Sequence, residues 1–363
     1  IVRKELTVLP ARVHVTEHVQ HVYACRNCQL HEESTPVVYA EAPSPILKNS
    51  LASPSLVANI MTKKYLDALP LYRQEQAFRR FGLDISRQTM SYWVIKSTEL
   101  WLKPIYDLLK QELLKEDILH ADETTLEVIH EPGRQASEKS YMWIYLTGHL
   151  STQSIVIYEY TPGRSGQFAE DFLGDFKGYL HCDGYAGYYK LEKNITSIGC
   201  WVHMRRKLLE ALQNIAPVGA TSKSLAQEGY NLCNQLFQLE KKWVKLSPEE
   251  RLVKRQEEAE PIVSKFFKWI HDNEPMVLPK SLLGKAFTYA ANQEKRLRNF
   301  LLDGRLEISN NRAERGIKPF VIGRKNWLFA NTPGGAESSA IVYSIVETAK
   351  MNNLNPFTYI EYL

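Results

Sequence analysis

The sequence predicts an α/β protein in which helices flank a mixed β-sheet and a long helical segment interrupts the sheet region. Three observations predict it. Three short-linked, strand-like segments fill residues 117–160, strand–helix alternation follows to about residue 204, and residues 205–300 are almost wholly helical in pattern.

Length and composition describe a folded protein of ordinary hydrophobicity. The 363 residues suggest two or three structural units, and 44% of them are hydrophobic. No apolar run approaches the roughly 20 residues that span a bilayer, and five cysteines without a disulfide spacing or a secretion signal favour a reducing compartment. We therefore expect a cytoplasmic protein with no membrane partner.

The N-terminal part precedes the sheet region. Residues 1–35 are polar and contain a C-x-x-C pair, and residues 36–55 form a proline- and serine-rich linker. Residues 56–112 are helical in pattern, with Gly82 in a turn and Ser86 beginning a second helix. This outline is that of a DNA-reading helix-turn-helix, although any small helical hairpin has the same outline.

Residues 113–204 and 301–352 are expected to form one catalytic core, separated by the helical insertion 205–300. β-Branched and aromatic residues predict five strands and one intervening helix before a helix that starts near Trp201. These are strands 117–128, 141–147, 154–160, 179–183 and 195–200, with the helix at 166–173. Ser247 begins a capping-box helix in the insertion. Residues 335–352 predict an amphipathic helix, and residues 353–363 form a tail.

Three acids stand in positions that suit metal chemistry. Asp122 lies inside the first predicted strand, Asp183 closes the fourth, and Glu314 lies in a polar helical segment. If the two strands are neighbours, both aspartates project at one edge of the sheet, and Glu314 reaches that edge from a helix. Carboxylates are the ligands that divalent ions need for phosphodiester transfer.

Each acid also has a structural interpretation. Asp183 before a glycine can initiate a turn, and Asp122 can be a buried, partnered acid. Glu314 fits a helix start capped by Asn311 and an i, i+4 pair with Lys318.

Longer motifs surround these acids and resemble the transposases of the IS66 insertion-sequence family over about residues 51–356. The resemblance rests on several motifs in the same order: LYRQEQAFRRFGLDISRQTMSYWV, LHADETTLEV, HCDGYAGY, GCWVHMRRK, ISNNRAERGIKPFVIGRKNWLF and ESSAIVYSIVETAKMNNLNP. It implies a DDE transposase with an RNase H-like core. Asp122, Asp183 and Glu314 would be its catalytic acids and would bind Mg²⁺ or Mn²⁺.

The same resemblance points to residues that contact DNA. Cys200-x-x-His203 resembles a signature of some DDE transposases, which implies that His203 lies near the active centre. Five basic residues lie between Arg312 and Lys325, as is typical of a phosphate-binding surface, although a solvated basic face has the same composition. The expected DNA-binding residues are His203, Arg205, Arg206, Asn310, Arg315, Arg324 and Lys325.

Cys25 and Cys28 are half of a four-ligand zinc site. Four histidines are one source of the missing ligands: His14, His18, His21 and His31. The resemblance implies another source, in which a first cysteine pair belongs upstream of residue 1, so that the chain is shortened and its zinc site incomplete.

The expected function is a bacterial, nucleoid-associated DNA transposase. It would cut at transposon terminal inverted repeats and join the freed 3′-hydroxyl to target DNA, as a multimer on DNA and with accessory transposon proteins. Two alternatives remain, a truncated non-catalytic DNA-binding relic and a nuclease of the same fold that cuts without joining.

Overall fold

The computed structural model describes residues 3–7, 12–31, 33–214 and 224–363. Residues 215–223 of the expected helical insertion lie outside the described residues. The strands are β1 (Val22–Ala24), β2 (Val37–Tyr39), β3 (Ile118–Glu127), β4 (Lys139–Thr147), β5 (Val156–Thr161), β6 (Gly178–His181) and β7 (Ile195–Ile198). The α-helices are α1 (Arg26–His31), α2 (Pro54–Tyr65), α3 (Leu71–Arg80), α4 (Arg87–Ser97), α5 (Lys103–Leu113), α6 (Gly166–Leu173), α7 (Trp201–Gln213), α8 (Leu225–Lys242), α9 (Pro248–Lys254), α10 (Glu260–Asn273), α11 (Leu282–Arg298), α12 (Asn311–Trp327), α13 (Pro333–Met351) and α14 (Pro356–Tyr362).

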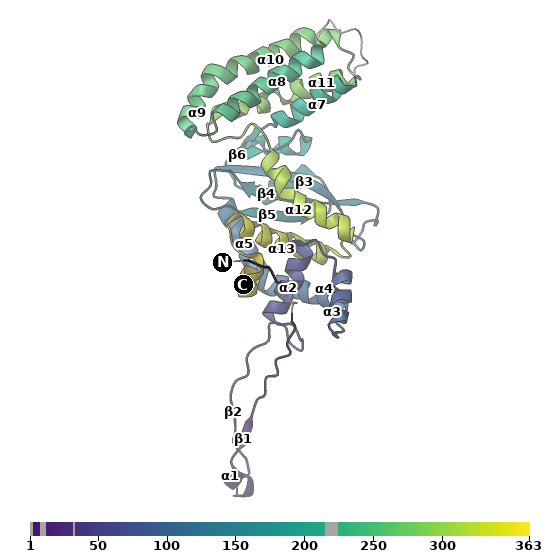
Figure 1. Cartoon of the computed structure of the whole chain (residues 1–363), viewed down its shortest axis with the longest axis vertical. Coiled ribbons are helices and arrows are strands. Elements are labelled where there is room, and N and C mark those ends of the chain that lie inside the picture. The colour runs from purple at the N-terminus through teal and green to yellow at the C-terminus, as the bar shows by residue number, and fades with distance from the viewer. Residues whose placement is uncertain (1–2, 8–11, 32, 215–223) are drawn as a thin grey trace.

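The molecule is elongated, with the sheet between two helical regions (Figure 1). Helices α7–α11 form a lobe at one end, and α2–α5 with α13 and α14 lie on the opposite side of the sheet. Two hydrophobic clusters match this arrangement, one around the sheet and its neighbouring helices and one inside the lobe. Within the described part of the chain, no helix combines the length and apolar composition needed to cross a membrane.

The central sheet confirms the predicted α/β class. Its strand order is β5-β4-β3-β6-β7. The β3–β4 and β4–β5 pairs are antiparallel, and the β3–β6 and β6–β7 pairs are parallel. Each predicted strand is present, but β6 ends at His181 and β7 at Ile198. Asp183 therefore lies in the loop beyond its strand. How the chain divides into independent units stays a prediction.

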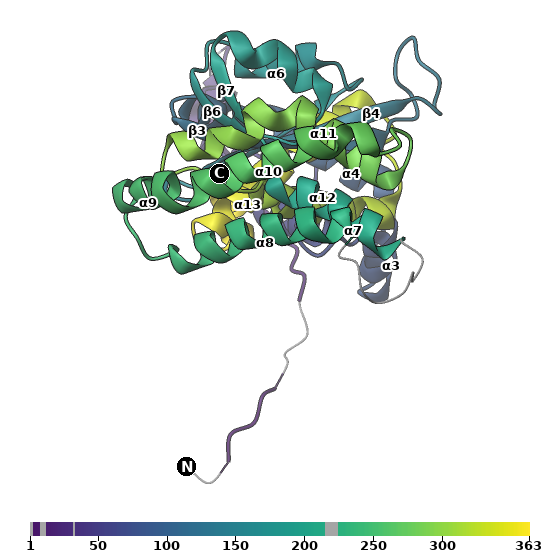
Figure 2. The same ribbon diagram turned by 90° about the horizontal axis from the view of Figure 1, so that it is seen from above.

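The two faces of the sheet are covered by different elements (Figure 2). On one face α12 packs so closely that a Cβ on Gly316 would lie 2.8 Å from Ile144 Cδ1. On the other face Phe172 of α6 stacks on Tyr145 of β4 with ring centroids 3.8 Å apart. Side chains alternate across a strand, so the face of a residue on β3 decides which of these layers it meets.

Helix α13 covers the edge of the sheet at β5. Its Ser344 Oγ accepts a hydrogen bond from Tyr158 N at 2.7 Å, and its Thr348 Oγ1 bonds Val156 N and O at 3.0 and 3.1 Å. These bonds satisfy backbone groups that an uncovered edge strand leaves exposed. The expected amphipathic helix is wrong in this respect, because β5 and surrounding helices bury α13 on nearly every side from residue 336 to 349.

The predicted pair of helices around Gly82 is present as α3 and α4. Gly82 has φ of 78°, a left-handed conformation that glycine adopts without strain. The side chain of Ser86 accepts a hydrogen bond from Thr89 N and caps α4 as expected. The N-terminal turns of α4 leave Arg87, Gln88 and Tyr92 exposed.

Candidate active site

Two aspartates occupy equivalent positions relative to the adjacent parallel strands β3 and β6, with Asp122 on β3 and Asp183 in the loop just beyond β6. The register pairs His120 with His181, whose rings stack with centroids 4.2 Å apart. Asp122 and Asp183 each follow two residues after their histidine. The sheet therefore brings both carboxylates to one edge, as their strand positions predicted. Asp183 Oδ1 also accepts a hydrogen bond from Tyr185 N at 2.8 Å, so the predicted turn is present as well.

Glu314 approaches the same region from the first turn of α12. Its Oε1 lies 3.5 Å from His203 Nε2, and its Oε2 lies 3.8 Å from Arg206 Nη2. Helix α12 begins at Asn311, and no side-chain hydrogen bond caps it. The capping interpretation of Glu314 is therefore wrong, because its carboxylate faces α7.

The electrostatics of Asp122 reflect the other acids around it. Burial, together with the negative charges of Glu123, Asp183 and Glu314, raises its pKa to about 8, against a hydrogen bond from Glu123 N that lowers it. Such a cluster repels itself unless a proton or cation neutralises it. Its oxygen donors fit a hard divalent ion such as Mg²⁺.

A sequence comparison identifies the protein family. The model of the IS66 transposase family matches residues 49–338. The chain belongs to the IS66 transposase family.

Three curated relatives of this IS66 chain come from Sinorhizobium fredii (strain NBRC 101917 / NGR234), and all three bear the name "uncharacterized protein". The protein y4qI is 32% identical over 89% of this chain, and y4jD and y4hP are each 28% identical over 98% of it. The chain spans 61%, 69% and 65% of the lengths of these relatives, respectively.

Glu123 is a site residue that the sequence analysis missed. It follows Asp122 on β3, and the alternation of side chains directs it to the opposite face of the sheet, where its side chain is 1% exposed. Tyr188 OH donates a hydrogen bond to its Oε2 at 2.7 Å, and Arg164 Nη2 donates one to its Oε1 at 2.6 Å. Burial and Asp183 raise the pKa of Glu123, while these two donors lower it. The only sequence signal was the acidic pair itself.

Asn310 has a role that differs from the expected contact with DNA. It is 1% exposed, its amide nitrogen donates to Ala121 O at 2.7 Å, and its Oδ1 lies 3.1 Å from His120 Nδ1. His120 Nε2 lies 2.8 Å from Glu307 Oε2, and this neighbour helps lower the pKa of Glu307. With its amide groups used inside the protein, Asn310 cannot reach a phosphate. It joins β3 to the start of α12 instead.

The remaining candidate DNA-binding residues occupy different environments. Arg205 contacts α8, with its Nη1 3.4 Å from Asn234 Oδ1 and its guanidinium 4.3 Å from the Phe237 ring. Arg324 donates hydrogen bonds to the hydroxyls of Thr124 and Thr125 on β3. Arg206 lies beside Glu314, as His203 does.

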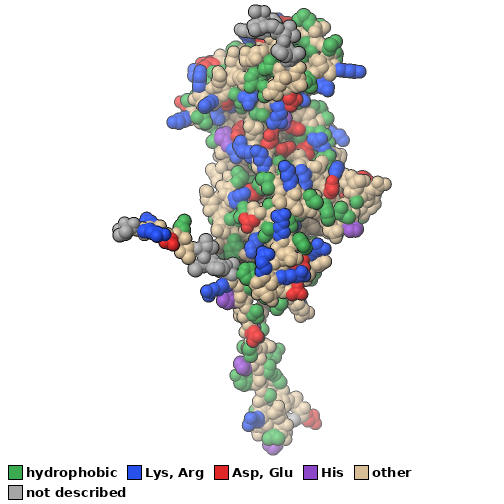
Figure 3. Space-filling model, turned by 45° about the vertical axis from the view of Figure 1, so that its right-hand side comes forward, with side chains coloured by type: hydrophobic (Ala, Val, Ile, Leu, Met, Phe, Trp, Pro, Cys, Tyr) green, Lys and Arg blue, Asp and Glu red, His purple; other side chains and the backbone are tan. Residues whose placement is uncertain are grey.

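The exposed basic residues of α12 form one helical stripe. We call Arg315, Lys318 and Lys325 the α12 basic stripe; all three are exposed and lie on the helix that carries Glu314. On the face in Figure 3, carboxylates gather at the waist between the helical lobe and the sheet, with lysine and arginine side chains around them. This arrangement places positive charge beside the acidic cluster.

Cys25 and Cys28 lie at the tip of the β1–β2 hairpin, far from the acids (Figure 1). Cys28, through its hydrogen bonds, lowers the pKa of the Cys25 thiol. Among the described residues, which include His14, His18 and His21, no third candidate ligand joins the two cysteines. The structure therefore leaves this pair as an incomplete ligand set.

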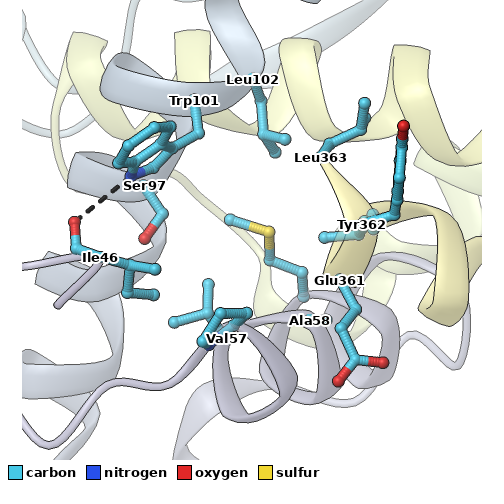
Figure 4. Close-up of a pocket in the computed structure, with 12 residues that line it drawn as sticks. Ile46, Val57, Ala58, Ser97, Trp101, Leu102, Glu361, Tyr362 and Leu363 are labelled. Carbon is cyan, nitrogen blue, oxygen red and sulfur yellow. Dashed lines mark hydrogen bonds between the residues drawn. The ribbon is translucent and has the colours of Figure 1, made fainter. Parts of the chain in front are cut away.

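The apolar pocket in Figure 4 lies elsewhere. Residues of α2, α14 and the turn of π-helix that follows α4 line it, among them Met61, Trp101 and Leu363. Trp101 Nε1 donates a hydrogen bond to Ile46 O at its rim. None of the three candidate acids lines this pocket, so it does not contribute to the candidate active site.

Asp122→Asn is expected to stabilise the metal-free protein more at pH 8 than at pH 5. The folded-state pKa of about 8 lies above the unfolded value of about 3.9, so the stability that this carboxyl contributes is present below pH ~4 and lost as pH rises toward 8. The gain at pH 8 should exceed the gain at pH 5 by about 3 to 4 kcal/mol. Urea unfolding in the presence of a metal chelator, at pH 5 and at pH 8, measures the free energy of unfolding of both proteins. Equal free-energy differences at both pH values would contradict the assigned electrostatics.

Proposed function

We propose that this chain is a DDE-type DNA transposase that cuts transposon ends and joins the 3′-hydroxyl to target DNA. One observation carries the proposal. In a chain of the IS66 transposase family, the negative charges of Asp183 and Glu314 act on the carboxyl of Asp122, although the three residues come from separate elements. A self-repelling group of this kind suits binding of divalent cations and transfer of phosphodiesters.

In this proposal the core is RNase H-like, and its sheet order supports that interpretation. Asp122 and Asp183 would hold Mg²⁺ or Mn²⁺ from adjacent parallel strands, and Glu314 would complete the ligand set from α12. The bound ions would neutralise charge at phosphorus and activate the attacking water or 3′-hydroxyl. Arg206 would orient the Glu314 carboxylate, which lies within 3.8 Å of it.

Glu123 has a separate task in the proposed mechanism. Its bonds to Arg164 and Tyr188 fix β3 from the face opposite Asp122. That fixation keeps Asp122 directed toward α12, because consecutive residues of a strand point to opposite faces. Glu123 would thus position the first acid without binding the ions itself.

Two surfaces are proposed to contact DNA. The exposed N-terminal turns of α4, with Arg87, Gln88 and Tyr92, suit a helix that reads the terminal inverted repeats. The α12 basic stripe suits contact with phosphates next to the acids. A multimer on paired ends and accessory transposon proteins belong to the same proposal.

Removing the α12 basic stripe is expected to weaken DNA binding of all sequences about equally. In Arg315→Ala/Lys318→Ala/Lys325→Ala, the slope of log K against log salt should become shallower by about 1 for each lost phosphate contact. Fluorescence anisotropy over a salt series measures this slope. The matched control is Lys265→Ala/Lys268→Ala/Lys280→Ala in the helical lobe, which removes the same charge from exposed positions. Equal slopes in the two triple variants would contradict phosphate binding by the stripe.

A strand-transfer assay tests the function itself. Purified protein is mixed with Mg²⁺, oligonucleotides carrying the ends of the element, and a target plasmid. Joined products are the expected result. Tight binding without cleavage would support the non-catalytic relic, and cleavage without joining would support the nuclease.

A further inference from the structure

The starts of α7 and α12 bring three chemically different ligand groups together. Cys200 caps α7, His203 lies in its first turn, and Glu314 lies in the first turn of α12. One ligand atom from each lies within 4.8 Å of the other two. In the part of the chain that the structure describes, no other three candidate metal ligands lie this close together.

The local fold holds these groups in place without a metal. Trp201 N donates a hydrogen bond to Ile308 O at 3.1 Å, and Asn310 N donates one to Cys200 Sγ at 3.3 Å. Both bonds join the start of α7 to the segment that leads into α12. Cys200 and His203 are three residues apart, so they share one side of the helix start.

The polar atoms at this point lack ordinary partners. Glu314 Oε1 and His203 Nδ1 are buried, and neither has a hydrogen-bond partner among the described residues. Buried polar atoms of this kind require an explanation such as a bound ion. His203 Nε2 already lies 3.5 Å from Glu314 Oε1, which is about the ligand separation around a tetrahedral ion with bonds of roughly 2.0–2.3 Å.

We propose that Cys200, His203 and Glu314 form a binding site for a thiophilic divalent cation such as Zn²⁺ or Co²⁺. Sulfur and imidazole ligands select these ions over Mg²⁺, which prefers oxygen. Three protein ligands leave a fourth position for water. Binding transfers the Cys200 thiol proton to solvent and forms a sulfur–metal bond. This site is separate in chemistry from the proposed Mg²⁺ site but shares Glu314 with it.

Titration with Co²⁺ tests the site without DNA or catalysis. The protein used is the full chain with Cys25→Ser/Cys28→Ser, so that the hairpin cysteines contribute no signal. We expect one Co²⁺ to bind with a thiolate-to-cobalt charge-transfer band. Cys200→Ser should remove this band, and His203→Gln should weaken binding by roughly 100-fold. Cys233→Ser, a buried cysteine of α8, is the control that should retain the band.

The variants separate ligand loss from loss of fold. Serine can still accept the hydrogen bond from Asn310 N, and thermal unfolding of each metal-free variant checks its stability. If Cys200→Ser does not fold, the partly exposed His203 decides the question alone. The proposal would be overturned if the starting protein showed no charge-transfer band. It would also be overturned if Cys200→Ser and His203→Gln both kept the band and the Co²⁺ affinity of the starting protein. Strand transfer in Mg²⁺ is measured separately, so either proposal can fail while the other stands.

Discussion

Asp183→Asn is expected to reduce strand transfer by at least about 10³-fold, equivalent to about 4 kcal/mol of transition-state stabilisation. Asparagine keeps the shape of the side chain and an oxygen that can accept the hydrogen bond from Tyr185 N. It loses the negative charge that a divalent cation needs from its ligand. The loss should therefore fall on catalysis, with the fold and the affinity for DNA retained. Product yield on end-bearing oligonucleotides in Mg²⁺ measures it.

The matched control is Glu159→Gln on β5. Glu159 is also a mostly buried carboxyl of the central sheet, and burial raises its pKa to about 7. It lies beside Lys110 rather than beside the three acids. Its amide variant should change strand transfer less than about 2-fold. Activity that survives in Asp183→Asn, or falls equally in both variants, would refute the metal-ligand assignment.

Arg255→Met is expected to destabilise the helical lobe by about 3–5 kcal/mol, because it leaves a carboxylate and three carbonyls without their donor. The Arg255 side chain is 0% exposed and forms paired 2.8 Å hydrogen bonds to the two oxygens of Glu240. It also donates to Phe300 O, Asp303 O and Leu306 O, at 2.8–2.9 Å. These bonds link α8 to the segment that leads to α12. Urea unfolding monitored by tryptophan fluorescence measures the loss.

Two further variants show whether the buried charge is the cause. Lys254→Met removes an exposed neighbour that pairs with Glu257 and Glu258 on the surface, and it should cost less than about 1 kcal/mol. Glu240→Met combined with Arg255→Met should recover part of the stability, since no uncompensated carboxylate remains. If the double variant is less stable than Arg255→Met alone, the explanation by the buried charge is wrong.

Local sequence patterns predicted the central elements well. β-Branched and aromatic runs identified all five strands of the central sheet, and the helix at residues 166–173 has the predicted bounds. The capping box at Ser247 is also present. These features depend on side-chain periodicity and on hydrogen bonds between residues three or four apart, which a sequence displays directly.

Non-local features escaped the same reasoning. The family resemblance suggested that Asn310 contacts DNA, yet His120 and the backbone of Ala121, far away in the sequence, use its amide inside the protein. The local sequence predicted that Glu314 belongs to a helix cap, but in the structure its carboxylate lies beside His203 and Arg206 of α7. The pattern of residues 335–352 predicted an amphipathic helix, but in the structure its neighbours bury it on nearly every side. In each case the deciding partner is remote in sequence.

The sequence by itself indicated the family and the strand segments, and it singled out three acids as candidates. It predicted that these acids lie near one another only on the condition that the strands of the two aspartates are neighbours. Burial in the folded protein is the main cause of the high pKa of Asp122, and the negative charges of Glu123, Asp183 and Glu314 add to it. Asp183 comes near through the parallel pairing of β3 and β6, and Glu314 through α12, which follows the helical lobe in the chain. The position of α12 also brings Glu314 close to Cys200 and His203. Burial and charge–charge repulsion depend on distances in three dimensions, and only the tertiary structure sets those distances.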